Sequence, residues 1–295
     1  MPPSVPEYQD ELVQHFGREG LRRFERASLL GARLPDAAPA MLEETGVPRG
    51  VAPYFRSPDD RDPVALGVFA VRSSLPRPHE AMENWPRIGG DGLAHLCVRP
   101  DGAVQAVILQ DVAEDMFVNA DVSRLSAALL ALDRALPLIE VASGMPEAVG
   151  ILRDLNAELR RIDSVAFEGR ESWWPRVLDD VRHTLNVPFS AAFEYVDAAG
   201  SKQVVTDFTG PGKGHPEEII WRGLSARGVK PEQVLRVHSE LEPCLMPGHY
   251  CAVWMQDRFP QAQFTHSFDY GISAESREEG IKQLIVHAAR QAGRG

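Results

Sequence analysis

The spacing of hydrophobic and polar residues divides the chain into two parts with different expected elements. In the second part, short runs with alternating apolar residues are interleaved with longer runs at helical spacing, so strands and helices should follow one another. The expected strands are 189–196, 202–208, 234–238 and 263–268, and the expected helices are about 173–186, 215–228, 247–258 and 274–291. This order predicts a mixed α/β layer design.

The first part predicts an α+β domain. Its first 50 residues have a helical pattern that is interrupted by prolines. Short apolar runs at 67–71, 94–98 and 104–109 are expected strands, and the Pro100-Asp-Gly102 turn should join the last two as a hairpin. Helices are expected at 119–132, with Asn119 and Asp121 as candidate capping residues, and at 146–161. Trp173 and Trp174 are expected to be core or domain-interface anchors.

The composition is that of a globular protein of about two domains, with 295 residues of which 44% are hydrophobic. The N-terminus has no basic segment followed by an apolar run, and no run approaches the roughly 18 apolar residues of a membrane-spanning helix. We therefore expect a cytoplasmic protein with no membrane partner. The net charge is −11, with −8 in residues 1–163 and −3 in residues 164–295, which argues against strong non-specific binding to duplex nucleic acid.

Two short segments carry the candidate chemistry. Gly214-His215-Pro216-Glu217 lies at an expected loop-to-helix junction, and Pro243-Cys244 precedes Cys251 at an expected strand-to-helix junction. Together they read H-x-E followed by P-C-x6-C, close to the H-x-E…P-C-x-x-C signature of the zinc deaminases. The chain has only three cysteines, so a close pair favours a metal or redox site over a disulfide scaffold.

These residue types suit a catalytic zinc ion, which takes three nitrogen or thiolate ligands and leaves one position for water. His215, Cys244 and Cys251 are the candidate Zn²⁺ ligands, and Glu217 is the candidate catalytic residue that moves protons. Six residues separate the cysteines where most deaminases have two, so His249 is an alternative third ligand. Glu218 is expected to be a solvated neighbour that complements the helix dipole.

From these motifs and the order of the flanking elements, residues 172–290 resemble the cytidine-deaminase-like superfamily, in particular its bacterial nucleic acid and nucleotide deaminases of polymorphic toxin systems. The resemblance implies a three-layer α/β/α domain with a mixed sheet. It also implies that His215, Cys244 and Cys251 bind zinc and that Glu217 shuttles protons. Pro243, in a run that is similar to the tRNA adenosine deaminase motif, is a candidate substrate-binding residue. His238 either lines the same pocket or packs within its strand.

Residues 15–140 resemble the SUKH superfamily, whose members supply immunity proteins in the same systems. The resemblance rests on three turn-like stretches, which are 85–92, 99–104 and 117–120. It implies a toxin or immunity protein as a partner. The expected domains are a SUKH-like α+β domain at 1–140, a connecting region at 141–171 and a zinc deaminase-like domain at 172–295.

The leading hypothesis is zinc-dependent hydrolytic deamination of a nucleobase, with cytosine favoured over adenine. The substrate would be nucleic acid, flipped out or single-stranded, or a free nucleotide. The alternative is an immunity or toxin-binding protein in which the deaminase fold is only a scaffold. A third hypothesis is a self-contained conflict-system enzyme whose N-terminal half senses and whose C-terminal half acts.

Overall fold

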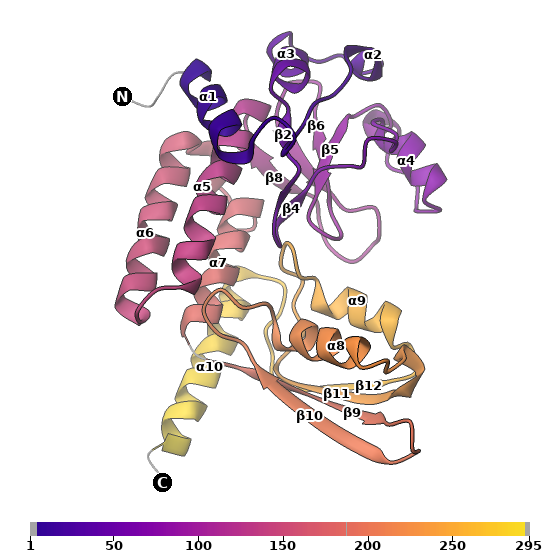
Figure 1. The fold of residues 1–295 in the computed structure, drawn as a ribbon, viewed down its shortest axis with the longest axis vertical. Coiled ribbons are helices and arrows are strands. Elements are labelled where there is room, and N and C mark those ends of the chain that lie inside the picture. The colour runs from indigo at the N-terminus through magenta and orange to yellow at the C-terminus, as the bar shows by residue number, and fades with distance from the viewer. Residues whose placement is uncertain (1–4, 187, 293–295) are drawn as a thin grey trace. The chain divides into compact units, whose positions relative to one another are not determined.

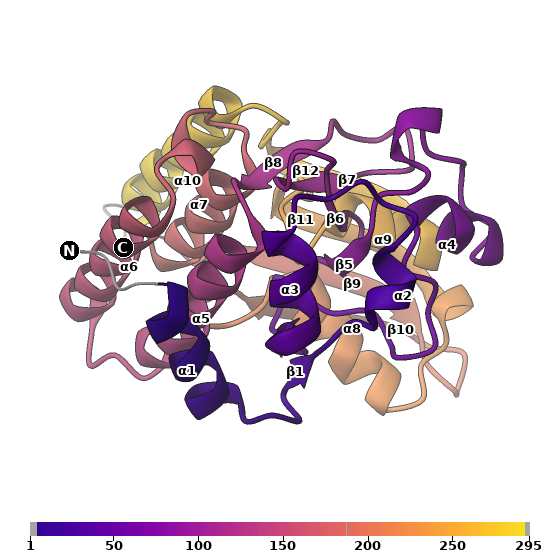
Figure 2. The same ribbon diagram turned by 90° about the horizontal axis from the view of Figure 1, so that it is seen from above.

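The computed structural model describes residues 5–186 and 188–292, and the chain forms two compact units. The first unit contains the residues up to Leu138 together with Gly150–Leu178. The second contains Ile139–Val149 together with the residues from Asp179 onward. Three long helices therefore have residues in both units, and they are α5 (Val122–Glu140), α6 (Met145–Ile162) and α7 (Trp173–Asn186). Their parts in the first unit lie side by side in both views (Figure 1 and Figure 2).

The first unit contains a six-stranded antiparallel sheet in the order β3-β4-β5-β6-β7-β8. Its strands are β3 (Gly50–Val51), β4 (Phe55–Arg56), β5 (Arg87–Gly90), β6 (His95–Val98), β7 (Val104–Val107) and β8 (Met116–Asn119). A two-stranded sheet pairs β1 (Leu21–Arg22) with β2 (Val47–Pro48). The other helices of the first unit are α1 (Val5–Phe16), α2 (Arg26–Leu29), α3 (Ala37–Glu44) and α4 (Leu66–Arg72). Short 3₁₀ turns lie at Glu80–Met82 and Val165–Phe167. The predicted hairpin is β6 and β7, joined through Gly102 at φ +91°.

The strand predicted at residues 67–71 is wrong, because this run lies in helix α4. Leu66 and Ala70 are buried, four residues apart, whereas Val68 and Val71 are about half exposed. That spacing is helical, with one buried stripe. A short apolar run has no periodicity that separates a helix from a buried strand, so the sequence pattern was ambiguous here.

The start of α7 is anchored by its two tryptophans, which are fully buried as predicted. The Trp173 indole N–H donates to the Asp91 carboxylate (2.8 Å), and the Trp174 indole N–H donates to the Asn119 side-chain oxygen (2.9 Å). Asn119 is therefore a core hydrogen-bonding residue rather than a helix cap. The cap is Asp121, whose carboxylate accepts from the Arg124 backbone N–H.

The second unit contains a four-stranded sheet in the order β10-β9-β11-β12. Strand β9 pairs antiparallel with both β10 and β11, whereas β11 and β12 run parallel. The predicted α/β class with a mixed sheet in this region is therefore confirmed. The strands are β9 (Ser190–Val196), β10 (Lys202–Phe208), β11 (Val234–Leu241) and β12 (Gln263–Phe268). The helices are α8 (Pro216–Ala226), α9 (Cys251–Arg258) and α10 (Ala274–Ala292), with a 3₁₀ turn at Pro231–Gln233.

One face of this sheet forms the core of the second unit. Helices α8 and α9 lie over that face (Figure 1), and α10 packs against β11 and β12. Buried side chains from the sheet and from these three helices form one apolar cluster, which includes Phe193, Ile220, Val237, Met255 and Ile281. Cys244 and Cys251 belong to the same cluster. The candidate chemistry therefore lies at the edge of a packed core.

Helix α9 begins later than the predicted residue 247. Pro247, Gly248 and His249 form a turn, and Tyr250 has a left-handed backbone (φ +44°, ψ +45°) that precedes the first helical residue, Cys251. Cys244 thus lies ahead of the helix and not in its first turn. Among the described residues, no helix is both long enough and apolar enough to cross a membrane.

Candidate metal centre and active site

His215 is held at the N-terminus of α8 by the residues that follow it. Its backbone is extended (φ −67°, ψ 148°), and Pro216 occupies the first helical position. Proline suits that position because its fixed φ is helical and it lacks an N–H that would have no partner. The His215 backbone N–H donates to the Glu218 carboxylate at 3.2 Å. The sequence His-Pro-Glu-Glu therefore fixes the backbone position from which the His215 side chain projects.

The two cysteines are brought together by the turn between β11 and α9. Cys244 follows the end of β11, and Cys251 is the first residue of α9. Within the turn, the N–H groups of His249 and Tyr250 both donate to the Met246 carbonyl, at 3.1 Å each. The Ala252 N–H donates to the Cys244 carbonyl at 3.1 Å. The six residues between the cysteines therefore form a closed loop that returns the chain to Cys244.

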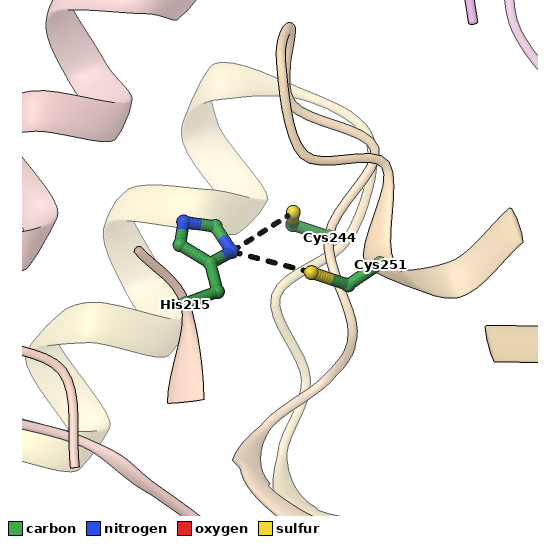
Figure 3. Close-up of side chains that lie close together, drawn as sticks. All are labelled: His215, Cys244 and Cys251. Atoms are coloured by element: carbon green, nitrogen blue, oxygen red, sulfur yellow. Dashed lines mark hydrogen bonds between the residues drawn. The ribbon is translucent and has the colours of Figure 1, made fainter. Parts of the chain in front are cut away.

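The side chains of His215, Cys244 and Cys251 converge on one point (Figure 3). His215 Nδ1 lies 3.4 Å from Cys244 Sγ and 3.4 Å from Cys251 Sγ. In a tetrahedral zinc site with bonds of about 2.3 Å to sulfur and about 2.05 Å to nitrogen, a nitrogen and a sulfur ligand lie about 3.5 Å apart. All three side chains are buried. The spacing and the chemistry of this donor set fit a zinc ion.

The charge state of the two thiols also fits a cation. Burial disfavours a thiolate at both cysteines, but the Cys251 thiol and the His215 ring stabilise one at Cys244 and lower its pKa well below the usual value. Burial and the neighbouring Cys244 raise the pKa of Cys251. A bound zinc ion ionises a coordinating thiol outright, so it would hold both sulfurs as thiolates.

Behind the imidazole of His215 lies Asp180, from helix α7. Asp180 Oδ1 is 3.1 Å from His215 Nε2, and Asp180 Oδ2 is 3.1 Å from His249 Nε2. Burial opposes the charge of Asp180, but the two imidazoles lower its pKa far below the usual value. A carboxylate that accepts the remote N–H of a ligating histidine fixes the tautomer that leaves the other nitrogen free for the metal. Here that other nitrogen is Nδ1, which faces both sulfurs.

His249 does not face the cysteines in this structure. Its ring stacks on that of His215, with centroids 3.9 Å apart. Its two nitrogens face carboxylates, Nε2 towards Asp180 and Nδ1 towards Glu218 (2.9 Å). Burial opposes protonation, but these carboxylates raise the pKa of His249 to about 9. Glu218 is therefore not only a solvated neighbour, because its carboxylate holds both His249 and the start of α8.

Glu217 is buried on the same side of the sheet as the ligand cluster. Its carboxylate accepts a hydrogen bond from the Ser239 hydroxyl at 2.6 Å, and Ser239 projects from the buried face of β11. Burial raises the pKa of Glu217 above the usual value, although His215 and Ser239 oppose the shift. A carboxyl with a raised pKa holds a proton more readily than an ordinary one, which suits a group that accepts and returns protons.

A small cavity of about 20 Å³ lies beside the cluster. Its lining includes Glu217, His215 and Cys244 together with Asp180, His183, Thr184, Phe189, Leu241, Glu242, Pro243 and Tyr270. This space is about that of one water molecule. The lining joins the proton-carrying carboxyl and two of the three candidate ligands around one space, which has room for an attacking water molecule.

The two candidate substrate-binding residues are placed differently. Pro243 lines the cavity. His238 neighbours Ser239 along β11 and therefore points to the opposite face of the sheet. There its ring contacts the hydroxyl groups of Thr265 (3.0 Å) and Ser267 (3.2 Å) on β12. The structure thus leaves His238 outside the cavity, packed against its neighbouring strand.

Sequence reasoning missed Asp180 and His183. The signal for Asp180 was an acidic residue on the apolar stripe of an amphipathic helix, since Trp173, Trp174 and Val177 on the same helix are fully buried. Acidic side chains are rarely buried without a partner, so such a position indicates an ion pair or a metal site. His183 had no comparable signal, because it lies far along the chain from the motifs.

Replacing Asp180 by asparagine should weaken zinc binding by about 10-fold to 100-fold, the usual effect of removing the partner of a ligating histidine. The amide lacks the charge that holds the His215 tautomer. Affinity is measured by competition with a chromophoric zinc chelator. Asp257→Asn, at an exposed position of α9, is the matched control and should not change the affinity. An unchanged affinity in the Asp180 variant would show that His215 is oriented without it.

Comparison with known families supports the division of the chain. A family model described as SUKH-4 immunity protein matches residues 8–180, which is more than half of the chain. A second model, described as Xanthomonas-like deaminase, matches residues 186–287 and contains all three candidate ligands and Glu217. Both resemblances inferred from sequence are confirmed. The first match also covers residues 141–171, and the exact domain boundaries stay a prediction. No curated protein and no solved structure matches the chain.

Proposed function

This chain belongs to the SUKH-4 immunity protein family and carries a deaminase-family domain after it. On that premise we propose that its second unit is a zinc-dependent hydrolase that deaminates a nucleobase, with cytosine favoured over adenine. The base would belong to a nucleotide or to single-stranded or flipped-out nucleic acid.

One observation carries the proposal. The His215 imidazole and the sulfurs of Cys244 and Cys251 meet at tetrahedral spacing. Glu217 shares a cavity with two of these ligands, His215 and Cys244, without belonging to the cluster. A structural zinc site would have four protein ligands and no use for a buried carboxyl beside it. Three ligands with a fourth direction left for water are typical of catalytic zinc.

Each residue has a role that follows from its position. Zinc, when bound, supplies activated water at neutral pH. Glu217 takes one proton from the attacking water and passes it to the ring nitrogen. It then takes the remaining proton of the added hydroxyl and passes it to the amine, so that the new carbonyl forms as the C–N bond breaks and ammonia leaves. Ser239 holds the Glu217 carboxylate in place through its hydroxyl. Asp180 holds the tautomer and plane of His215.

The experiment is to incubate purified, zinc-loaded full-length protein with cytidine and adenosine, as mononucleotides and within single-stranded DNA and RNA. Mass spectrometry then detects uracil or inosine products. We expect uracil from the cytosine substrates at a higher rate than inosine from the adenine substrates. If fully zinc-loaded protein forms neither product from any substrate, the hydrolase proposal fails.

The SUKH-4 match favours a second candidate function, in which the chain is an immunity or toxin-binding protein and the deaminase fold is a scaffold. The first unit would then bind a toxin, and the net charge of −8 in residues 1–163 is suited to a basic toxin surface. Robust turnover together with a pull-down that recovers no toxin would contradict this candidate. In a combined protein, the first unit would sense a partner and the second would act.

A further inference from the structure

We propose that Tyr270 selects the base, by donating its hydroxyl hydrogen to the ring carbonyl of a pyrimidine. This inference rests on the proposed function, since it requires that the cavity beside the zinc ligands takes a nucleobase. It identifies the physical origin of a preference for cytosine, which has a ring carbonyl, over adenine, which has none.

Tyr270 forms part of the wall of the cavity that contains Glu217 and Cys244. It lies in the segment between β12 and α10, and it is 5% exposed. The backbone N–H groups of Tyr270 and Gly271 both donate to the Glu242 carboxylate, at 3.1 and 2.9 Å. Glu242 is itself in the wall of the cavity. The tyrosine is therefore held against the reaction space by its backbone as well as by its side chain.

A short relay sets the direction in which the Tyr270 hydroxyl donates. Tyr270 Oη is 2.5 Å from His183 Nδ1, and Arg182 Nη2 is 3.3 Å from His183 Nε2. A guanidinium only donates, so Nε2 must accept, and in a neutral ring Nδ1 then carries the hydrogen. Burial and the charge of Arg182 keep His183 neutral by lowering its pKa to about 3. His183 therefore donates to Tyr270.

Because Tyr270 accepts from His183, its own hydrogen is left to donate to another acceptor. The same Arg182 nitrogen also binds the Asp179 carboxylate at 2.9 Å, which keeps the guanidinium in position. The Tyr270 phenol stays protonated, since burial raises its pKa well above the usual value. The wall of the cavity thus contains a neutral hydrogen-bond donor as well as the proton-carrying Glu217.

A donor in this place suits cytosine more than adenine. During deamination Glu217 serves the ring nitrogen next to the reacting carbon, and the cytosine ring carbonyl lies on the other side of that nitrogen. An adenine ring offers only nitrogen acceptors and a C–H at the corresponding position. The size of the base favours cytosine as well. The cavity has room for about one water molecule, so side chains in its wall must move to admit any base, and they must move less for a one-ring base than for a two-ring base.

The test uses the full-length zinc-loaded chain and three probes: cytidine 5′-monophosphate, its 2-thio analogue, which is a poor hydrogen-bond acceptor, and adenosine 5′-monophosphate. Binding is measured by calorimetry, and turnover is measured separately. We expect the unmodified protein to bind the 2-thio analogue about 10-fold to 100-fold more weakly than the natural nucleotide. In Tyr270→Phe this ratio should fall to near one while zinc content stays unchanged. Tyr195→Phe, in β9 outside the cavity, is the matched control and should keep the ratio.

The relay is tested with His183→Asn and His183→Leu. Asparagine keeps an N–H at the position of Nδ1, so this variant should keep most of the difference in affinity between the natural nucleotide and its 2-thio analogue. The leucine variant should lose that difference. Discrimination in binding without any deamination would overturn the proposed function and leave this inference standing. If the protein deaminates its substrate but the ratio of affinities for the natural nucleotide and its 2-thio analogue is the same in the unmodified protein and in Tyr270→Phe, the inference is overturned and the proposed function stands. An unmodified protein that does not distinguish the carbonyl from the thiocarbonyl, or binds neither, would also overturn it.

Discussion

Glu217→Gln should keep one zinc ion per chain and lower the deamination rate by about 10²-fold to 10⁴-fold, the usual contribution of a positioned acid–base group. The change keeps the shape of the side chain, and the amide oxygen can still accept the hydrogen bond from Ser239. It removes the ability to take up and return a proton. The three candidate ligands are untouched, so binding of the metal should not change.

Metal content by mass spectrometry and product formation are measured on the same protein preparation. Glu232→Gln, at an exposed position of the same unit, controls for the loss of one negative charge and should leave both readings unchanged. A variant at position 217 that turns over at the full rate would show that another group moves the protons. One that loses zinc would mean that Glu217 is part of the metal site.

Cys244→Ala should lose both stable zinc binding and turnover. Cys244 Sγ is one of the two cysteine sulfurs that face His215 Nδ1, so its removal leaves two of the three candidate ligands for an ion that needs at least three. Because metal binding is coupled to folding of the site, the variant should also unfold at a lower temperature than the zinc-loaded parent. Metal content after dialysis, turnover and a thermal melt give three independent readings.

The matched control is Cys97→Ala, which removes a thiol that is equally buried but lies in strand β6 of the first unit. Its side chain serves as a small apolar group, and zinc content should stay at one ion per chain. If Cys244→Ala retained zinc with parental affinity while Cys97→Ala lost it, the ligand assignment would be wrong. Comparison with Glu217→Gln then separates loss of metal from loss of proton transfer.

Most elements of the second unit were predictable from the sequence. The strands at 202–208 and 263–268 have the predicted bounds, because alternating polar residues and flanking turn residues set them locally. The start of α8 was predicted to within one residue, since a proline at the first helical position is a local signal. The start of α9 was missed, because the left-handed Tyr250 that precedes it has no sequence signal of the kind a glycine provides.

The surroundings of the ligands were not predictable in the same way. Asp180 reaches His215 across 35 positions of sequence, and Tyr270 reaches His183 across 87. Nothing in either segment shows which distant partner it meets. His238 shows the converse case, because it lies beside Ser239 in the chain, yet the pleat of β11 turns it to the opposite face from Glu217.

The sequence by itself determined the two families, the order of strands and helices in the second unit, and a set of side chains with the chemistry of a zinc deaminase. These features depend on residue type and short spacing, which are local properties of the chain. The tertiary structure decided that His215 Nδ1 lies 3.4 Å from each of two sulfurs, that Asp180 lies behind that imidazole, and that His183 and Tyr270 share the cavity. Such contacts arise only when distant segments are packed into one core, since burial brings together groups that no spacing rule relates.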